Sequence, residues 1–143
     1  MKASKFLRIA SIIALIQYSA HAFLFLSATP KHGQDEISLI EAMKSHHWNF
    51  AGFDHSYWDF YLGYGLLVIL WGFIEVLLLW QLSILAKNVS IRLKPIIALL
   101  LLVNVGHAVL TLRYFFLVPA IFDLIVALFL GFAFISIGKN SKS

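Results

Sequence analysis

The chain contains no cysteine and very little charge. Without cysteine, its 143 residues can form no disulfide, Cys-ligated zinc site, iron–sulfur cluster or thiol nucleophile. Only 13% of the residues are charged and three are proline, whereas 61% are hydrophobic. Soluble domains have about 25% charged and about 45–50% apolar residues. A water-soluble core of this length cannot hide so much apolar surface, so the composition predicts one small integral membrane domain, residues 1–143.

Four hydrophobic runs are long enough to cross a bilayer. Each has roughly 20 residues or slightly more, and at about 1.5 Å per helical residue this length crosses a hydrocarbon core of about 30 Å. We therefore predict an all-α fold, a four-helix transmembrane bundle. The expected spans are residues 5–27, 57–82, 93–112 and 117–137.

The basic residues are distributed unevenly between the two sides of these spans. One side carries only Lys31, Lys44 and Arg113. The other side carries eight basic residues and no acidic residue, and by the positive-inside rule it is cytoplasmic, as are both termini. The distribution of the basic charge gives the orientation, and the net charge of +4 does not indicate nucleic acid as a partner. The eight are Lys2, Lys5, Arg8, Lys87, Arg92, Lys94, Lys139 and Lys142.

The first span also has features of a secretory signal. A basic start and an apolar run precede Ala20-His21-Ala22, which imitates a cleavage site. The apolar residues from Phe23 to Leu26 extend the run to membrane-spanning length and favour a retained helix. Whether the N-terminus is cleaved stays open at this point.

The outer loop, residues 28–56, contains a short amphipathic pattern. Between Gln34 and Lys44, Ile37, Ile40 and Met43 share one helical side, with acidic residues at the start and a lysine at the end. This arrangement suits the helix dipole. It predicts a short helix that lies flat on the outer leaflet.

An aromatic and histidine-rich stretch follows this helix. Its aromatic residues are typical of an interfacial belt. They are Trp48, Phe50, Phe53, Tyr57, Trp58 and Tyr61. His46, His47 and His55, beside Asp54 and Asp59, offer nitrogen and carboxylate groups for a metal, but their spacing matches no established motif. The spacing therefore favours solvated loop histidines, and whether they bind a metal stays open at this point.

The same stretch carries a resemblance to a known family. Residues His46 to Gly65, above all Ser56-Tyr-Trp-Asp-Phe-Tyr-Leu-Gly-Tyr-Gly65, resemble small four-helix bacterial integral membrane proteins catalogued as uncharacterised. This resemblance implies a multi-pass protein of the bacterial inner membrane and carries no function. A looser likeness is to the emopamil-binding and sterol-isomerase superfamily, whose members place His and Glu in a lipid-accessible pocket between helices. No continuous motif of that superfamily aligns here, so none of its catalytic residues is transferred.

Each span carries its polar and small residues along one stripe. Because unpaired polar groups in hydrocarbon are costly, the four stripes should converge on the bundle interior. The first stripe is Ala14, Gln17 and His21, with Tyr18 beside it, and the second is Tyr61, Tyr64, Gly65, Val68, Gly72 and Glu75. The third is Asn104, His107 and Thr111, and the fourth is Ala120, Asp123, Ala127 and Gly131.

Depth along the helices predicts which of these residues meet. His21, His107 and Asp123 each lie about 9 Å below the outer boundary, so we take them as candidate catalytic residues. As ligand-binding residues we expect Gln17 and Asn104 one turn deeper, and Asp59, Tyr61 and Tyr64 above or at the rim. Glu75 follows Asp59 by sixteen residues, roughly 24 Å, which places it in the cytoplasmic half with Arg8 as its expected partner.

Three functions are compatible with this outer group. In the first, it forms a pocket that binds a small lipophilic ligand or acts on it by acid–base chemistry, which leaves open whether the protein is an enzyme. In the second, the chain is a structural or accessory membrane subunit, and its partners are a second copy or a larger membrane complex. In the third, His21 and His107 are the axial ligands of a b-type haem. The first function requires no cofactor.

Overall fold

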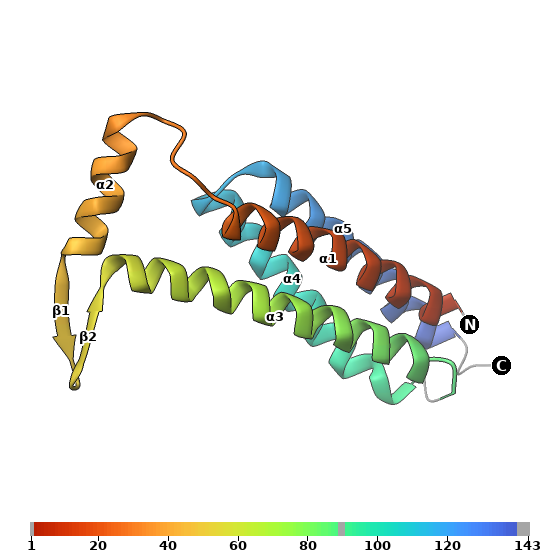
Figure 1. The fold of residues 1–143 in the computed structure, drawn as a ribbon. Helices are drawn as coiled ribbons and strands as arrows, with labels where there is room; N and C mark the ends of the chain where they lie inside the picture. The colour runs from red at the N-terminus through yellow and green to blue at the C-terminus, as the bar shows by residue number, and fades with distance from the viewer. Residues whose placement is uncertain (1, 89–90, 140–143) are drawn as a thin grey trace. The chain divides into compact units, whose positions relative to one another are not determined.

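The computed structural model describes residues 2–88 and 91–139. Within this part of the chain the fold is helical except for one small hairpin of two strands (Figure 1). The helices are α1 (Lys2–Leu26), α2 (Gln34–Ser45), α3 (Tyr57–Leu85), the 3-10 helix η1 (Ile91–Leu93), α4 (Lys94–Tyr114) and α5 (Leu117–Lys139). The strands are β1 (His47–Phe50) and β2 (Phe53–Ser56).

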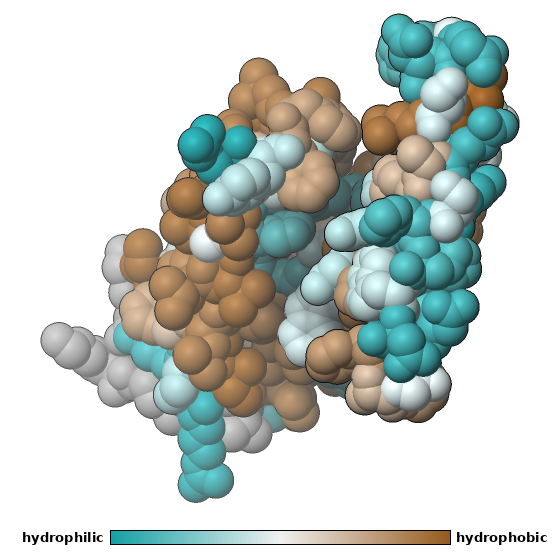
Figure 2. Space-filling model, turned by 90° about the vertical axis from the view of Figure 1, so that its left-hand side faces the viewer, coloured by the Kyte–Doolittle hydropathy of each residue, from teal (hydrophilic) through white to brown (hydrophobic). Residues whose placement is uncertain are grey.

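Four of the helices, α1, α3, α4 and α5, are long and apolar enough to cross a membrane. They coincide with the four predicted spans to within three residues at each end. Large hydrophobic side chains remain exposed along all four helices, and Figure 2 shows broad hydrophobic areas on the surface. The chain therefore has the character of a multi-pass membrane protein with a helical bundle.

Contacts divide the chain into two compact units. The first contains the described residues up to Ser19 and those from Gly72 onwards, and the second contains Ala20–Trp71. Helices α1 and α3 thus each contribute to both units. That the whole chain is a single domain stays a prediction.

The core of the first unit consists of aliphatic and small residues. Leu7 of α1, Leu79 of α3, Ile97 of α4 and Leu130 of α5 are completely buried. Small residues let helix backbones approach closely in a membrane. Accordingly, Ala10 and Ala14 of α1 and Ala120, Ala127 and Ala133 of α5 are buried as well.

Helices α4 and α5 are joined by a short connection and form an antiparallel pair (Figure 1). The amide of Phe115 donates to the carbonyl of Thr111 at 2.9 Å and closes the end of α4. Pro119 lies in the first turn of α5, where its missing N–H leaves no helical hydrogen bond unmade. This hairpin holds the polar residues of the two helices in a fixed register.

The second unit contains helix α2 in the range that its amphipathic pattern predicts, with one residue more at its end. It also contains a β-hairpin that we did not expect, in which Phe50 pairs with Phe53 across a two-residue turn. Ala51 (φ 52°) and Gly52 (φ 88°) both have positive φ, which is the geometry of a type I′ turn. Asn-Gly and Asp-Gly are the usual sequence signals for this turn, and Ala-Gly gives a much weaker one.

Candidate functional site

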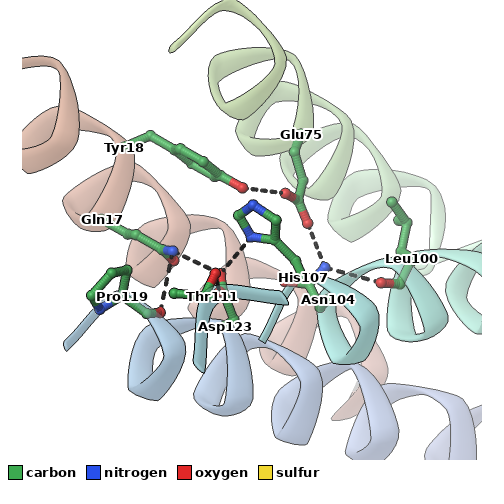
Figure 3. A network of polar contacts seen from close by, with 9 residues as sticks. All are labelled: Gln17, Tyr18, Glu75, Leu100, Asn104, His107, Thr111, Pro119 and Asp123. Carbon is green, nitrogen blue, oxygen red and sulfur yellow. Dashed lines mark hydrogen bonds and ion pairs between the residues drawn. The ribbon is translucent and has the colours of Figure 1, made fainter. Parts of the chain in front are cut away.

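Polar side chains from four helices meet inside the first unit (Figure 3). All are buried except His107, which is partly exposed. We call this group the polar cluster. It consists of Gln17 and Tyr18 from α1, Glu75 from α3, Asn104, His107 and Thr111 from α4, and Asp123 from α5.

Asp123 is the most deeply buried member, at 1% exposure. Its Oδ1 accepts a hydrogen bond from Gln17 Nε2 at 2.7 Å and lies 3.2 Å from His107 Nδ1. Its Oδ2 is 3.4 Å from the Thr111 hydroxyl, a weaker contact. A buried carboxylate needs such donors, because hydrogen bonds replace the water that it loses. Asp123 therefore connects α1 and α4 to α5.

The His107 imidazole contacts Asp123 through Nδ1, and part of its side chain is exposed. Its side chain is 41% exposed, whereas that of its partner Asp123 is 1% exposed. When the imidazole is neutral, donation from Nδ1 to Asp123 leaves the lone pair on Nε2. A carboxylate that fixes one imidazole nitrogen and leaves the other for a reactant is a recurrent arrangement in acid–base sites.

Glu75 forms the second centre of the polar cluster. The Tyr18 hydroxyl donates to its Oε2 at 3.0 Å, and Asn104 Nδ2 donates to its Oε1 at 2.6 Å. Asn104 Nδ2 is also 2.9 Å from the carbonyl of Leu100. In Figure 3 the His107 ring lies between the Tyr18–Glu75 pair and Asp123.

The expected pairing of Glu75 with Arg8 is wrong. The Arg8 guanidinium lies over the Trp80 ring, 4.7 Å from its centroid, and among the described residues neither Glu75 nor Asp123 forms an ion pair with Lys or Arg. Helix α3 has 29 residues, about 44 Å, and is much longer than a bilayer core of about 30 Å. Counting from its first turn therefore placed Glu75 too deep.

Tyr18 is a member of the polar cluster to which the sequence analysis gave no role. Its ring packs against Gly72 of α3 so closely that a Cβ at that position would overlap it. The signal was present in the sequence, because Gly72 and Glu75 are three residues apart on one helical face. The glycine admits the ring, and the carboxylate receives its hydroxyl.

Four of the expected site residues belong to the second unit. The His21 ring stacks on Phe25, with centroids 5.8 Å apart, and Phe25 in turn contacts Tyr61. Tyr61 and Tyr64 are exposed. Their roles and that of His21 in catalysis or ligand binding stay predictions.

Asp59, the fourth of these residues, caps helix α3. Its Oδ2 accepts hydrogen bonds from the Ser56 amide at 2.7 Å and from the Ser56 hydroxyl at 2.8 Å. The Asp59 amide donates back to the Ser56 hydroxyl at 3.2 Å. This reciprocal pattern is a capping box, in which both side chains satisfy the free amides of the first helical turn. The structure thus gives Asp59 a clear role in starting α3.

The loop histidines also have individual contacts. His47 Nδ1 lies 3.3 Å from Asp54 Oδ2, His46 stacks on Tyr57, and His55 meets the Phe60 ring edge-on. Across the ranges that the structure describes, no three His, Cys, Asp or Glu residues are grouped as metal ligands. The hairpin holds these histidines in separate contacts.

Comparison with known proteins gave no relative. No family model, curated protein or solved structure matches the chain. The likeness of residues His46 to Gly65 to small bacterial membrane proteins therefore stays a prediction, and function must be argued from the polar cluster itself.

Proposed function

We propose that this multi-pass membrane protein uses the polar cluster to bind a small lipophilic ligand, or to act on it by acid–base chemistry, at His107. The observation that carries this proposal is the contrast within one pair, an accessible imidazole held by a fully buried carboxylate. A buried pair with no accessible edge would fit a purely structural role. In the pair of His107 and Asp123, the His107 side chain is partly exposed and can be reached by a reactant.

The chemistry follows from the hydrogen bonds. Asp123 fixes the ring orientation of His107, and Gln17 fixes Asp123 in turn at 2.7 Å. The Nε2 atom, which Asp123 does not engage, is then suited to accept a hydrogen bond or a proton from a hydroxyl group of a ligand. A protonated imidazole carries an N–H at both nitrogens, so it can donate a hydrogen bond to a carbonyl group of a ligand.

The surroundings of His107 favour a lipophilic ligand. Val103 and Leu110, one helical turn before and after it on the same side of α4, are both exposed and aliphatic. A molecule at His107 would therefore meet one polar edge between two apolar side chains. Because α4 has the length and hydropathy of a membrane span, such a molecule would arrive through the bilayer.

A second function is supported by a different observation. The hydrogen bonds of Asp123 and Glu75 cross between α1, α3, α4 and α5 and would hold these helices together without any ligand. Such bonds contribute only about 0.6 kcal/mol each on average in a membrane. Under this alternative the protein is a structural or accessory subunit, and its function lies in contacts with a second copy or a larger complex.

The test is to identify what the purified protein carries. Native mass spectrometry and lipid extraction of the wild type are compared with His107→Ala and Asp123→Asn, and Gln81→Ala at an exposed position of α3 is the matched control. We expect a small lipophilic molecule with the wild type and with Gln81→Ala, and its loss in the other two variants. A wild type that carries no such molecule, or His107→Ala and Asp123→Asn variants that retain it, would contradict the proposal.

Two further readouts separate the alternatives. If both cluster variants keep the same bound molecules and only their melting temperature falls, the structural function is supported. The haem hypothesis, which needs both His21 and His107 as axial ligands, stays a prediction. A Soret band that disappears in His21→Ala and in His107→Ala would establish haem in place of the lipophilic ligand.

A further inference from the structure

The β-hairpin of the second unit has two chemically different faces. Side chains alternate along a strand, and the pairing of Trp48 with His55 and of Phe50 with Phe53 puts these four on one face. The opposite face carries His47, Asn49, Asp54 and Ser56. We call them the aromatic face and the polar face. On the polar face, His47 and Asp54 form an ion pair when the histidine is protonated.

Contacts with α3 show which way the aromatic face points. The Trp48 ring lies 4.4 Å from that of Tyr57 and 5.1 Å from that of Phe60, measured between centroids. Phe60 is in the first turn of α3, one of the helices that can cross the membrane. The aromatic face is therefore on the side toward which α3 runs, and the polar face points the other way.

Within the second unit, nothing covers the end of the aromatic face. Phe50 is 73% exposed and Phe53 is 66% exposed. The strands extend sideways from the start of α3 (Figure 1), and four residues at about 3.3 Å each carry the tip about 13 Å away. The tip thus lies beyond the reach of the first turn of α3.

We propose that Phe50 and Phe53 insert into the lipid interface of the leaflet at which α3 begins, so that the hairpin anchors the second unit on the membrane surface. Lipid is favoured as the occupant because the exposed aromatic surface is continuous with Tyr57 and Phe60, which are themselves exposed on α3. Burial of the two phenyl rings in the interface removes apolar surface from water, and His47, Asn49 and Asp54 on the polar face stay exposed. This inference concerns the second unit and is independent of ligand binding at His107.

The absence of cysteine makes a direct test possible, because single cysteines can be placed without background labelling. Spin labels are attached to Phe50→Cys and Phe53→Cys, with Asn49→Cys and Asp54→Cys as matched controls on the polar face. In liposomes, the ratio of accessibility to oxygen over accessibility to a water-soluble nickel chelate should be several-fold higher at positions 50 and 53. In the controls, the nickel chelate should have ready access.

Two results would overturn the proposal. Equal access of the nickel chelate to all four positions would show that the hairpin lies in water. Low access of both reagents to positions 50 and 53 would show a protein partner on the aromatic face.

A second measurement avoids substitution altogether. In bicelles, a spin-labelled fatty acid should broaden the NMR signals of the Phe50 and Phe53 rings, and a water-soluble gadolinium chelate should broaden those of Asn49 and Asp54. The reverse pattern, or broadening of both faces by the gadolinium chelate, would also contradict the insertion.

Discussion

At the scale of single residues, the two buried carboxylates are satisfied by different sets of donors. Asp123 receives an amide, an imidazole and a hydroxyl group, whereas Glu75 receives an amide and a phenol. Hydrogen bonds to a charged acceptor are stronger than those between neutral groups. The position of each carboxylate is thus set by side chains from other helices.

Removing the Asp123 carboxylate should destabilise the first unit. In Asp123→Ala, the buried Gln17 amide and the partly exposed His107 ring lose their common acceptor, and we expect the free energy of unfolding to fall by about 1–3 kcal/mol. Thr111→Val is the matched control, because its bond to Asp123 is long at 3.4 Å and its loss should cost much less. Denaturation in detergent micelles measures both, and equal stability of Asp123→Ala and the wild type would contradict the role of Asp123.

At the scale of elements, the approach of α1 to α3 depends on one glycine. Gly72 faces the Tyr18 ring, and further along the same two helices the hydroxyl of Ser11 donates to the carbonyl of Val76 at 2.9 Å. A small residue here allows a close contact that a larger one would prevent.

Gly72→Ala should therefore destabilise the protein, although alanine favours helices. The added methyl overlaps the Tyr18 ring, and overpacking of this kind costs about 1–3 kcal/mol. Gly63→Ala in the same helix is the control, because nothing lies within 4 Å of the added Cβ there. It should stabilise α3 by up to about 1 kcal/mol. Thermal unfolding followed by circular dichroism measures both, and a Gly72→Ala variant as stable as Gly63→Ala would show that the contact with Tyr18 is not tight.

Helix α2 should lose stability in acid at its first turn. Hydrogen bonds from the backbone amides of His32 and Lys31 to Glu36 lower the pKa of this carboxyl below its ordinary value of 4.5. Because the folded pKa is depressed, the stabilisation is complete above the unfolded pKa and is lost as pH falls through the folded pKa. After correction for the intrinsic exchange rates, hydrogen exchange of the backbone amides at residues 34–38 should thus accelerate below about pH 4.5.

Glu36→Gln should remove this acid dependence, and Glu41→Gln on the same helix should retain it. If the first turn of α2 exchanges at the same corrected rate between pH 7 and pH 3 in the wild type, the bonds to Glu36 contribute nothing to the helix.

At the scale of the whole molecule, the four apolar helices and the uneven basic charge predict a defined orientation. Lys142, one of the eight basic residues on which the orientation rests, lies outside the described residues. The other seven lie within or next to the ends of α1, α3, α4 and α5 that are assigned to the cytoplasm. The outer loop, with α2 and the hairpin, would then lie on the opposite side.

Cysteine labelling of intact cells tests this orientation. A membrane-impermeant maleimide should label Ser45→Cys, at the end of α2, and should label Lys87→Cys only after the membrane is opened. The chain without added cysteine provides the background. Labelling of Lys87→Cys but not Ser45→Cys in intact cells would reverse the predicted topology.

The proximity of His107 to Asp123 followed from the sequence, because each is a polar residue at equal depth on adjacent helices joined by a short turn. The pairing of Glu75 with Asn104 and Tyr18 did not follow. If the residue at which α3 enters the membrane is misplaced by a few positions, the predicted partners of every α3 side chain shift by one helical turn. The hairpin was missed for another reason, since Ala51-Gly52 is a weak turn signal and only the closing of the strands fixes positive φ at Ala51.

The sequence by itself determined the four apolar helices and their ends to within three residues, because length and hydropathy act locally along the chain. It also determined which side of each helix carries polar groups. Only the tertiary structure decided which of those groups meet. Partners in a helical bundle depend on how far each helix slides along its neighbour, and close packing such as that of Tyr18 on Gly72 sets this offset.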